Sequence, residues 1–497
     1  MSRTPLAAGA AAFLIAASLS LVRFPWPCIH DEFSHLLAAD TFAHGRLANP
    51  TPPLWEHFES PHVILAPSYA SKYPPGQGLV MALGRVLFGL PIVGVWLSAG
   101  LCAAAFCWML AGWGVPKRWV WLGGLLVATH RGLLTDWAQS YWGGLVPFLG
   151  GALLFGSLPR LIRRPRAAGF WLAVGLAVLA NSRPYEGLVA SLCACGYILL
   201  RRRRIRLLPA ATTLAPVLLA NFLWMGLYNQ RVTGDPFTAP YQVHERTYSV
   251  APVFLFSPKR PEPVYRHETI RRFQLEWELG LYESQQSLGG LLKYKLGATW
   301  RAACFAWLPS LFIPLFFLRR RWRSFHTRFA LAGLLIGFAG SWLSKCFMPH
   351  YLAPSMPLAL LLSVQGLRRL RPPRLIHWIV AAHLAGLSMA YVFRVPPRLL
   401  EAEWRESGAP FGWLRTKLRQ QLEKTGGDHL VLVRYGPKHD FHQEWVYNGA
   451  DLGGSRVVWA RSMGPESDRK LVEHFKGRRA WLLDVKDKDL PRLERYK

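Results

Sequence analysis

An acidic, histidine-rich segment, His30-Asp31-Glu32-Phe33-Ser34-His35, directly follows the first apolar run of the chain. Adjacent carboxylates beside a membrane surface repel each other and lose solvation, so their presence needs a reason. One reason is structural, because Asp and Glu at the start of a helix accept hydrogen bonds from unpaired amides. The other is chemical, because a carboxylate in such a place can take a proton from a reacting group.

Arg183 and Glu186 form a second charged pair in an unusual place. They lie in Asn181-Ser182-Arg183-Pro184-Tyr185-Glu186-Gly187, between two apolar runs and with almost no loop to solvate them. One interpretation is an internal ion pair in a tight turn, with Pro184 at the start of the next helix. The other is contact with a phosphate or a sugar, since ions at a membrane edge are commonly functional. The sequence leaves both interpretations open.

Potential metal ligands also gather after the first apolar run, namely His30, Asp31, Glu32, His35 and His44. Their spacing does not match HExxH or a dense zinc pattern. We therefore predict no metal and no other cofactor, with a divalent ion as the alternative. The seven cysteines lie mostly in apolar runs and form no CxxC pair, so they predict packing residues and no disulfide framework.

The scaffold for these groups is predicted to be a membrane bundle, because 51% of the 497 residues are hydrophobic and 22 are Trp. A membrane-crossing helix needs about 20 apolar residues. The run from Leu6 to Val22 has no small-residue cleavage site after it, so we predict an uncleaved span and no signal peptide. Residues 78–90, with Arg85 in their middle, predict an amphipathic helix at the membrane interface. The predicted spans are 5–23, 91–114, 119–131, 143–159, 168–182, 185–200, 207–227, 298–318, 327–344, 351–367 and 375–393.

Charge separates cleanly across this predicted bundle of eleven helices. With the N-terminus inside, the only charged residues of the inner connections are Lys and Arg, as in Arg201–Arg204. All 29 Asp and Glu fall in segments assigned outside or, for Glu186, at the outer end of a predicted span. An excess of Lys and Arg marks cytoplasmic connections. The pattern predicts a multi-pass protein of the bacterial inner membrane with a cytoplasmic N-terminus. The net charge of +30 thus indicates topology and contact with anionic lipid, and no nucleic-acid partner is predicted.

Three segments project outside in this topology: residues 24–90, residues 228–297 and the tail 394–497. The second carries aromatic and charged residues such as Tyr241 and His244, which suit sugar rings but are also ordinary membrane anchors. In the tail, residues 431–435, 456–460 and 479–483 predict strands, and 411–424 and 467–476 predict helices. The predicted fold class is therefore an all-α polytopic membrane bundle (residues 1–393) with a small periplasmic α/β accessory domain (residues 394–497).

The order of four short motifs resembles the GT-C glycosyltransferase superfamily, which includes the protein O-mannosyltransferases and the aminoarabinose transferases of lipid A. Each motif is weak alone, but their order, side and spacing are together moderately specific over about residues 1–365. The motifs are the Asp31-Glu32 pair after the first span, Ser71-Lys72-Tyr73-Pro74-Pro75-Gly76 ahead of the amphipathic stretch, Asp136 in the next outer connection, and Lys345-Cys346-Phe347-Met348-Pro349-His350-Tyr351-Leu352-Ala353-Pro354.

This resemblance implies inverting transfer of a sugar from a polyprenyl phosphate to an acceptor hydroxyl outside the cytoplasm. Asp31 would be the base, and Glu32 would orient it or raise its pKa. The departing phosphate would need fixed cations, for which Lys345, His350 and Arg183 are the candidates. The remaining predicted substrate contacts are Asp136, Tyr73, Lys72, Glu186 and Tyr351.

The implied partners are a polyprenyl-phosphate sugar, membrane lipids, and a glycolipid, polysaccharide or protein acceptor. A transporter or flippase would also have many spans, but it would be expected to place charged or broken helices near the bilayer midplane. Here the spans are almost free of ions, and the acidic residues gather outside. A third alternative is a non-catalytic scaffold that displays the tail domain.

Overall fold

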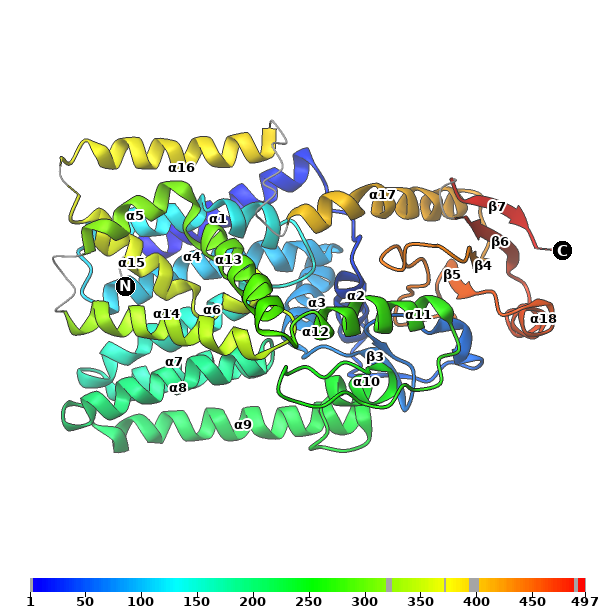
Figure 1. The fold of residues 1–497 in the computed structure, drawn as a ribbon, viewed down its shortest axis with the longest axis horizontal. Helices are drawn as coiled ribbons and strands as arrows, with labels where there is room; N and C mark the ends of the chain where they lie inside the picture. The colour runs from blue at the N-terminus through cyan, green and yellow to red at the C-terminus, as the bar shows by residue number, and fades with distance from the viewer. Residues whose placement is uncertain (1–2, 319–323, 371, 393–401, 487–489, 497) are drawn as a thin grey trace.

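A computed structural model of the chain describes residues 3–318, 324–370, 372–392, 402–486 and 490–496. Long helices lie side by side at one end, and a smaller α/β domain extends from the other (Figure 1). Each predicted span corresponds to a helix. These helices are α1 (Thr4–Val22), α4 (Pro91–Gly112), α5 (Lys117–Ala128), α6 (Leu145–Ser157), α7 (Pro165–Ala180), α8 (Pro184–Arg201), α9 (Leu207–Thr233), α13 (Leu288–Phe316), α14 (Phe325–Leu343), α15 (Met356–Leu367) and α16 (Leu375–Val392).

Only some of these helices are both long enough and apolar enough to cross a membrane. In the described part of the chain, 4 helical stretches are long and apolar enough, namely Thr4–Val22, Pro91–Gly112, Leu145–Ile162 and Leu207–Thr233. Other apolar helices are shorter, with 10–17 residues. The helical bundle with a C-terminal sheet domain is confirmed, whereas the number of eleven crossings is not.

Local sequence explains where the helices begin and how closely they pack. Pro91, Pro165 and Pro184 each occupy the first position of a helix, where a missing N–H costs nothing. The helices α1 and α4 meet at Gly9 and Gly100, and a Cβ atom built on either glycine would lie 2.9 Å from the carbonyl oxygen of the other. Small residues at such crossings allow backbones to approach, which is how helices associate in lipid.

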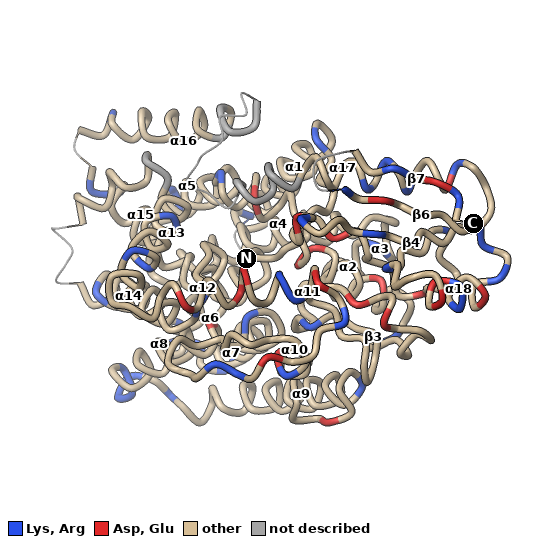
Figure 2. Tube along the Cα trace, turned by 45° about the vertical axis from the view of Figure 1, so that its right-hand side comes forward, with Lys and Arg blue, Asp and Glu red and all other residues tan. Residues whose placement is uncertain are grey.

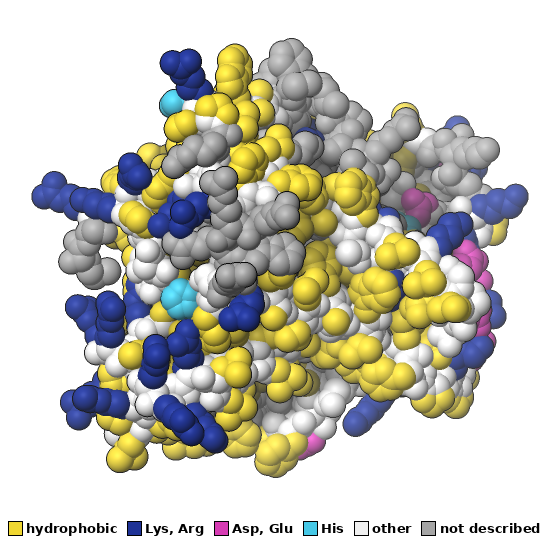
Figure 3. Space-filling model, turned by 60° about the vertical axis from the view of Figure 1, so that its left-hand side comes forward, with side chains coloured by type: hydrophobic (Ala, Val, Ile, Leu, Met, Phe, Trp, Pro, Cys, Tyr) yellow, Lys and Arg dark blue, Asp and Glu magenta, His cyan; other side chains and the backbone are white. Residues whose placement is uncertain are grey.

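Acidic residues are distributed unevenly along the structure. Asp and Glu lie mostly toward the α/β domain, whereas Lys and Arg lie both in that domain and at the helix ends far from it (Figure 2). Figure 3 turns the helix ends far from the α/β domain toward the viewer, and basic side chains project there beside an apolar surface. Which end faces the cytoplasm stays a prediction. The predicted domain boundary at 393/394 and the basic connections at 319–323 and 371 lie outside the described residues.

Two connecting segments fold on top of the bundle. The first of them, which precedes α4, ends in the helix α3 (Gly76–Phe88). One side of α3 is buried, and the other exposes apolar residues such as Leu83, Val86 and Leu87. An amphipathic helix over about 78–90 is thereby confirmed, and its place at a membrane interface stays a prediction. The first segment contains α2 (His30–Ala43), β1 (Asn49–Pro50), η1 (Trp55–Phe58), β2 (Val63–Ile64), β3 (Ser68–Ser71) and α3 (Gly76–Phe88). The second contains α10 (Pro240–Tyr248), α11 (Glu268–Arg272), the π-helical η5 (Phe273–Leu279) and α12 (Gly280–Glu283).

The tail forms the predicted α/β domain around one four-stranded sheet. Its strand order is β5-β4-β6-β7, with β4 parallel to both neighbours and β7 antiparallel to β6. The three predicted strands and two predicted helices are confirmed, and β7 is a strand that the sequence did not predict. The elements are α17 (Ala402–Lys424), β4 (His429–Tyr435), β5 (Val457–Arg461), α18 (Pro465–His474), β6 (Arg479–Val485) and β7 (Arg492–Arg495).

The α/β domain shares its hydrophobic core with the first connecting segment. Phe33, Leu37 and Tyr69 of that segment belong to the same buried cluster as Leu430 and Trp459 of the sheet. Burial of apolar surface stabilises this junction by about 25 cal/mol per Å². The domain is therefore packed firmly against the segment that carries Asp31.

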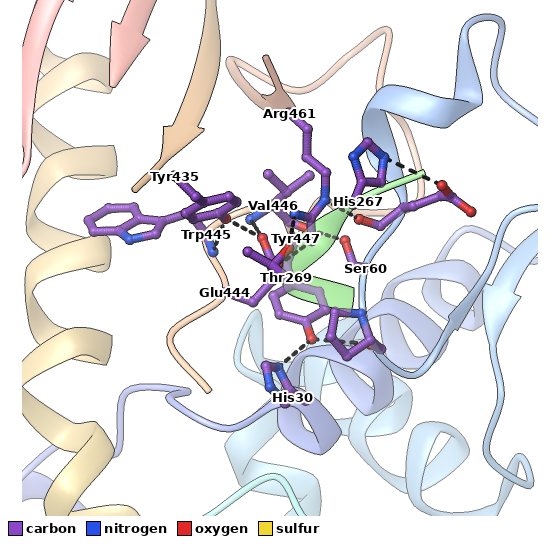
Figure 4. A network of polar contacts seen from close by, with 12 residues as sticks. His30, Ser60, His267, Thr269, Tyr435, Glu444, Trp445, Val446, Tyr447 and Arg461 are labelled. Atoms are coloured by element: carbon purple, nitrogen blue, oxygen red, sulfur yellow. Dashed lines mark hydrogen bonds and ion pairs between the residues drawn. The ribbon is translucent and has the colours of Figure 1, made fainter. Parts of the chain in front are cut away.

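Arg461 joins three segments through its guanidinium group (Figure 4). It donates to the Glu59 carbonyl oxygen at 2.7 Å and to Thr269 Oγ1 at 2.6 Å, and it forms a buried ion pair with Glu444. Glu444 also accepts hydrogen bonds from the Tyr435 hydroxyl and, at 2.9 Å, from a backbone N–H. Because these charges are both paired and hydrogen-bonded, they fix how the α/β domain sits on the connecting segments.

Replacing Arg461 with methionine is expected to destabilise the fold by about 3–5 kcal/mol, because the buried Glu444 would lose its charged partner. Thermal unfolding in detergent measures the change as a lower Tm. The matched control is Arg434→Met, since Arg434 pairs with Asp484 at 3.1 Å but is 56% exposed. That change should cost about 0–1 kcal/mol. Equal Tm values for the two variants would show that the buried pair does not hold the domains together.

Candidate active site

Asp31 and Glu32 lie in the first turn of α2, but their side chains point to different surroundings. Glu32 is fully buried, and one of its oxygens accepts hydrogen bonds from the N–H groups of Cys28 at 2.8 Å and Ile29 at 3.3 Å. Its other oxygen accepts from the Tyr141 N–H at 3.0 Å. Glu32 therefore caps the helix that carries Asp31 and ties it to the segment after α5.

Asp31 faces a cavity of about 180 Å³ between the helix ends and the two connecting segments. Tyr73 Oη donates a hydrogen bond to Asp31 Oδ1 at 2.5 Å, and His62 Nε2 lies 3.8 Å from Oδ2. Burial, followed by the nearby charge of Asp31, raises the pKa of Tyr73 well above its usual value, so the phenol keeps its proton. The side chain of Asp31 is 23% exposed. The carboxylate is thus oriented by its neighbours and still reachable from the cavity.

Three cations line the same cavity, and they differ in their partners. Lys345 Nζ lies 2.6 Å from Glu278 Oε2, and the Arg183 guanidinium lies 3.9 Å from Glu186. The ammonium group of Lys72 lies 4.9 Å from the ring centre of Tyr241, and it has no ion pair within the described part of the chain. Lys72 is therefore the cation of this cavity whose charge is not matched by an adjacent carboxylate.

Burial opposes the charge of both Lys72 and Lys345, but the net direction of the pKa shift differs between them. Burial lowers the pKa of Lys72, while the more distant carboxylates of Glu245, Glu278 and Asp31 act in the opposite direction. For Lys345, burial also opposes the charge, but the adjacent Glu278 carboxylate raises the pKa above its usual value. A negatively charged ligand would favour the charged form of Lys72 most, because that lysine lacks an adjacent counter-charge.

The backbone around Lys345 is held in place by several hydrogen bonds. Its N–H donates to the Val253 carbonyl at 2.9 Å, and its carbonyl accepts from Gln285 Nε2 at 2.7 Å. Lys295, which is buried within α13, donates from Nζ to the Ser344 carbonyl at 2.5 Å. The cation is therefore presented by a braced segment, as a site for a fixed charge requires.

A second cavity, of about 430 Å³, adjoins the first and is more apolar. Its walls include Pro75, Val146, Pro147, Met225 and Phe254, from the ends of several helices and from the connecting segments. Both cavities are lined by Asp31, Lys72, Tyr73, Trp142, Arg183, Tyr241, Val253, Ser344 and Tyr351. Asp31, Lys72 and Arg183 thus stand where the small cavity meets the larger, more apolar one.

No family model and no curated protein matches this sequence. Among solved structures, it is similar to ArnT from Cupriavidus metallidurans in the apo state, with 15% identity, a TM-score of 0.54 and coverage of 95% of this chain and 92% of that chain. The same protein bound to undecaprenyl phosphate matches at 13% identity, with a TM-score of 0.51 and the same coverage. The chain has the GT-C fold. The Archaeoglobus fulgidus oligosaccharyltransferase matches less well, with 10% identity, a TM-score of 0.49 and coverage of 97% of this chain and 69% of that chain.

Within this GT-C fold, the predicted site residues mostly come together. The structure places Lys72, Tyr73, Arg183, Lys345, His350 and Tyr351 around Asp31 in the first cavity, and Glu186 in the wall of the second. Glu32 and Asp136 do not line either cavity. Asp136 is buried in the π-helical η2 (Gly132–Trp137), where Thr135 Oγ1 donates to its Oδ1 at 3.3 Å.

Several residues of the first cavity were not predicted. Glu278 lies in η5, and its sequence signal is an acidic residue beside Trp277 in an aromatic segment outside the membrane. His62 had no local signal. His442 comes from the tail, which is predicted from the sequence to be an accessory domain. The cavity of this GT-C fold therefore combines three outer segments.

Three buried histidines of this region favour the neutral form. Burial lowers the pKa of His30, His62 and His244 well below the usual value. A neutral imidazole carries one donor and one acceptor, so these rings suit hydroxyl groups. Among the residues that the structure describes, no group of three or more His, Cys, Asp and Glu side chains is arranged to hold a metal ion.

Proposed function

We propose that this chain is a membrane glycosyltransferase that moves a sugar from a polyprenyl phosphate to an acceptor hydroxyl on the outer face of the bacterial inner membrane. The observation that carries the proposal is that Asp31 shares one cavity with Lys72, Arg183 and Lys345, at the junction with an apolar cavity. A base and a set of fixed cations are the two requirements of this transfer.

In the proposed reaction, the acceptor oxygen attacks the anomeric carbon of the donor sugar, and Asp31 takes the hydroxyl proton. The bond from the anomeric carbon to the phosphate oxygen breaks, and its electron pair leaves with the lipid phosphate. Lys72, Arg183 and Lys345 stabilise the charge that develops there. Tyr73 holds Asp31 Oδ1, which leaves Oδ2 as the oxygen that takes the proton. A single displacement inverts the anomeric centre.

The lipid part of the donor is assigned to the larger, apolar cavity. Its apolar walls suit a hydrocarbon chain, whereas the cations at its junction with the smaller cavity suit the phosphate. The similarity in fold to ArnT bound to undecaprenyl phosphate supports this assignment. The acceptor is a glycolipid, a polysaccharide or a protein of the cell envelope.

The place of the charged groups favours this function over transport. They lie between the helix ends and the outer connecting segments, whereas a transporter site is expected near the bilayer midplane. The GT-C fold adds a second argument, because its ArnT representatives match over most of both chains. In the proposed topology, the N-terminus is cytoplasmic and the α/β domain is periplasmic.

The proposed donor site is tested by binding of undecaprenyl phosphate to the purified protein. Lys345→Ala should weaken binding about tenfold, because it removes one cation and leaves the Glu278 carboxylate facing the phosphate. Lys259→Ala is the matched control, since Lys259 pairs with Glu283 at 2.8 Å but is 52% exposed. Equal affinities for the wild type and Lys345→Ala would remove Lys345 from the phosphate site.

The transfer itself is tested by mass analysis of envelope glycans in a deletion strain. We expect one sugar to be missing from a defined glycan and to return when the wild-type gene is restored. Identical glycan profiles with and without the protein would contradict the proposed function.

A further inference from the structure

The α/β domain reaches the Asp31 cavity through His442, in the segment between β4 and β5. The imidazole lies 5.1 Å from Trp277, 6.0 Å from Phe273 and 5.9 Å from His30, measured between ring centres. These three partners come from the two connecting segments. His442 thus lies where all three outer parts of the chain meet.

The segment that carries His442 is held on both sides of this residue. Asp440 Oδ1 accepts a hydrogen bond from the backbone N–H of His442 at 3.0 Å, and Arg272 of α11 donates to the His439 carbonyl at 2.9 Å. On the other side, Glu444 forms the buried ion pair with Arg461. The position of His442 is therefore set by the α/β domain, and no rearrangement is needed to bring it to the cavity.

The two cavities differ in the residues that belong to only one of them. His30, Phe273, Trp277 and His442 line the small cavity and are absent from the walls of the apolar cavity. Lys72, Arg183 and Tyr351 line both. A donor that enters with its lipid in the apolar cavity meets the shared cations there, and the wall around His442 belongs to the part of the small cavity that the apolar cavity does not share.

This wall combines flat rings with hydrogen-bonding groups. Aromatic faces suit the C–H faces of a sugar ring, and an imidazole can donate to or accept from a hydroxyl group. Burial lowers the pKa of His442, although Asp440, Glu278 and Asp31 act in the opposite direction. A ligand ring that carries hydroxyl groups would match both the aromatic faces and the hydrogen-bonding groups of this wall.

We infer that the α/β domain forms the acceptor side of the cavity, and that His442 positions a saccharide acceptor whose hydroxyl faces Asp31. This inference rests on the proposed transferase function and deepens it, because it assigns the acceptor to a saccharide and gives the tail a part in substrate recognition. Phe273 and Trp277 hold the acceptor ring, and His442 directs its hydroxyl. His442 is a positioning residue, since Asp31 takes the proton.

The test uses the full chain, expressed in the deletion strain. His442→Ala should lower the amount of sugar added to the envelope saccharide at least tenfold, and His442→Gln, which keeps a donor and an acceptor, should restore much of it. Affinity for undecaprenyl phosphate and Tm should stay at wild-type values in both variants. His474→Ala is the control, because His474 is exposed on α18 of the same domain.

Three results would overturn this inference. The first is wild-type sugar addition by His442→Ala, and the second is a loss of undecaprenyl phosphate affinity as large as that of Lys345→Ala, which would place His442 on the donor side. The third is a product in which the sugar is attached to protein. Failure of the proposed function looks different, because then the wild type itself would neither bind undecaprenyl phosphate nor change the glycans.

Discussion

Replacing Asp31 with asparagine is expected to reduce sugar transfer about 1000-fold while the protein still folds and binds undecaprenyl phosphate. Asparagine has the size of aspartate and can still accept the hydrogen bond from Tyr73, but it cannot take a proton. General bases contribute about 100-fold to 10,000-fold to such reactions. The measurement is the amount of the missing sugar in envelope glycans of the deletion strain expressing the variant.

The control for this prediction separates chemistry from folding. Asp451→Asn changes an exposed carboxylate in the α/β domain, and it should transfer as well as the wild type. Undecaprenyl phosphate affinity should be similar for the wild type and both variants. Full transfer by a well-folded Asp31→Asn protein would remove Asp31 from the role of base, whatever the protein binds.

The helices were predictable because hydropathy is a local property. Each predicted span is an apolar run that becomes a helix, and Pro91, Pro165 and Pro184 mark three of the starts. Whether a helix crosses the membrane also depends on its neighbours, because a short one such as α5 (Lys117–Ala128) can be covered by protein. The number of crossings therefore does not follow from the sequence alone.

The different roles of the two acidic residues at the start of α2 became visible only in the structure. Asp31 and Glu32 are adjacent in sequence, yet one faces the cavity and the other accepts three backbone hydrogen bonds. The Tyr141 N–H, which holds Glu32, comes from a distant segment. Asp136 lies in the outer connection where the resemblance places a second acidic residue, but its π-helical turn buries it away from both cavities.

Glu278 and His442 could not be placed from the sequence because their positions depend on packing between segments. Glu278 reaches Lys345 through the π-helical turn η5, whose geometry has no reliable sequence pattern. His442 reaches the cavity because Arg461 and Glu444 dock the tail on the connecting segments. The complete site thus forms only when the outer segments pack together, although sequence motifs predicted most of its cations.

Replacing Lys72 with methionine is expected to weaken undecaprenyl phosphate binding about 100-fold, the largest loss for any single cation of the cavity. Lys345 and Arg183 have carboxylates beside them, so their charges are partly used within the protein, whereas Lys72 packs against aromatic rings. A charge-assisted hydrogen bond to phosphate in a buried site is worth about 1.5–3 kcal/mol, or roughly 10-fold to 100-fold. Methionine keeps the apolar stem that packs on Tyr241.

The pH dependence of this binding identifies Lys72 more sharply than the loss of affinity does. Burial lowers the pKa of Lys72, so its ammonium loses a proton at a lower pH than the usual value of about 10.4 for lysine. A lysine is charged below its pKa, and affinity for the anionic phosphate should therefore fall as pH rises through that lowered pKa. Above about pH 7 the phosphate itself keeps its charge, since its second pKa is about 6.

Lys72→Arg supplies the discriminating variant, because arginine stays charged throughout this pH range. It should regain part of the affinity lost in Lys72→Met and bind equally well across the interval in which the wild type weakens. The raised pKa values of Lys345, Tyr73 and Tyr241 keep those groups from titrating in the same interval. If Lys72→Met binds undecaprenyl phosphate with the wild-type pH profile, another group holds the phosphate, and the apolar cavity must then direct the lipid to a different end of the site.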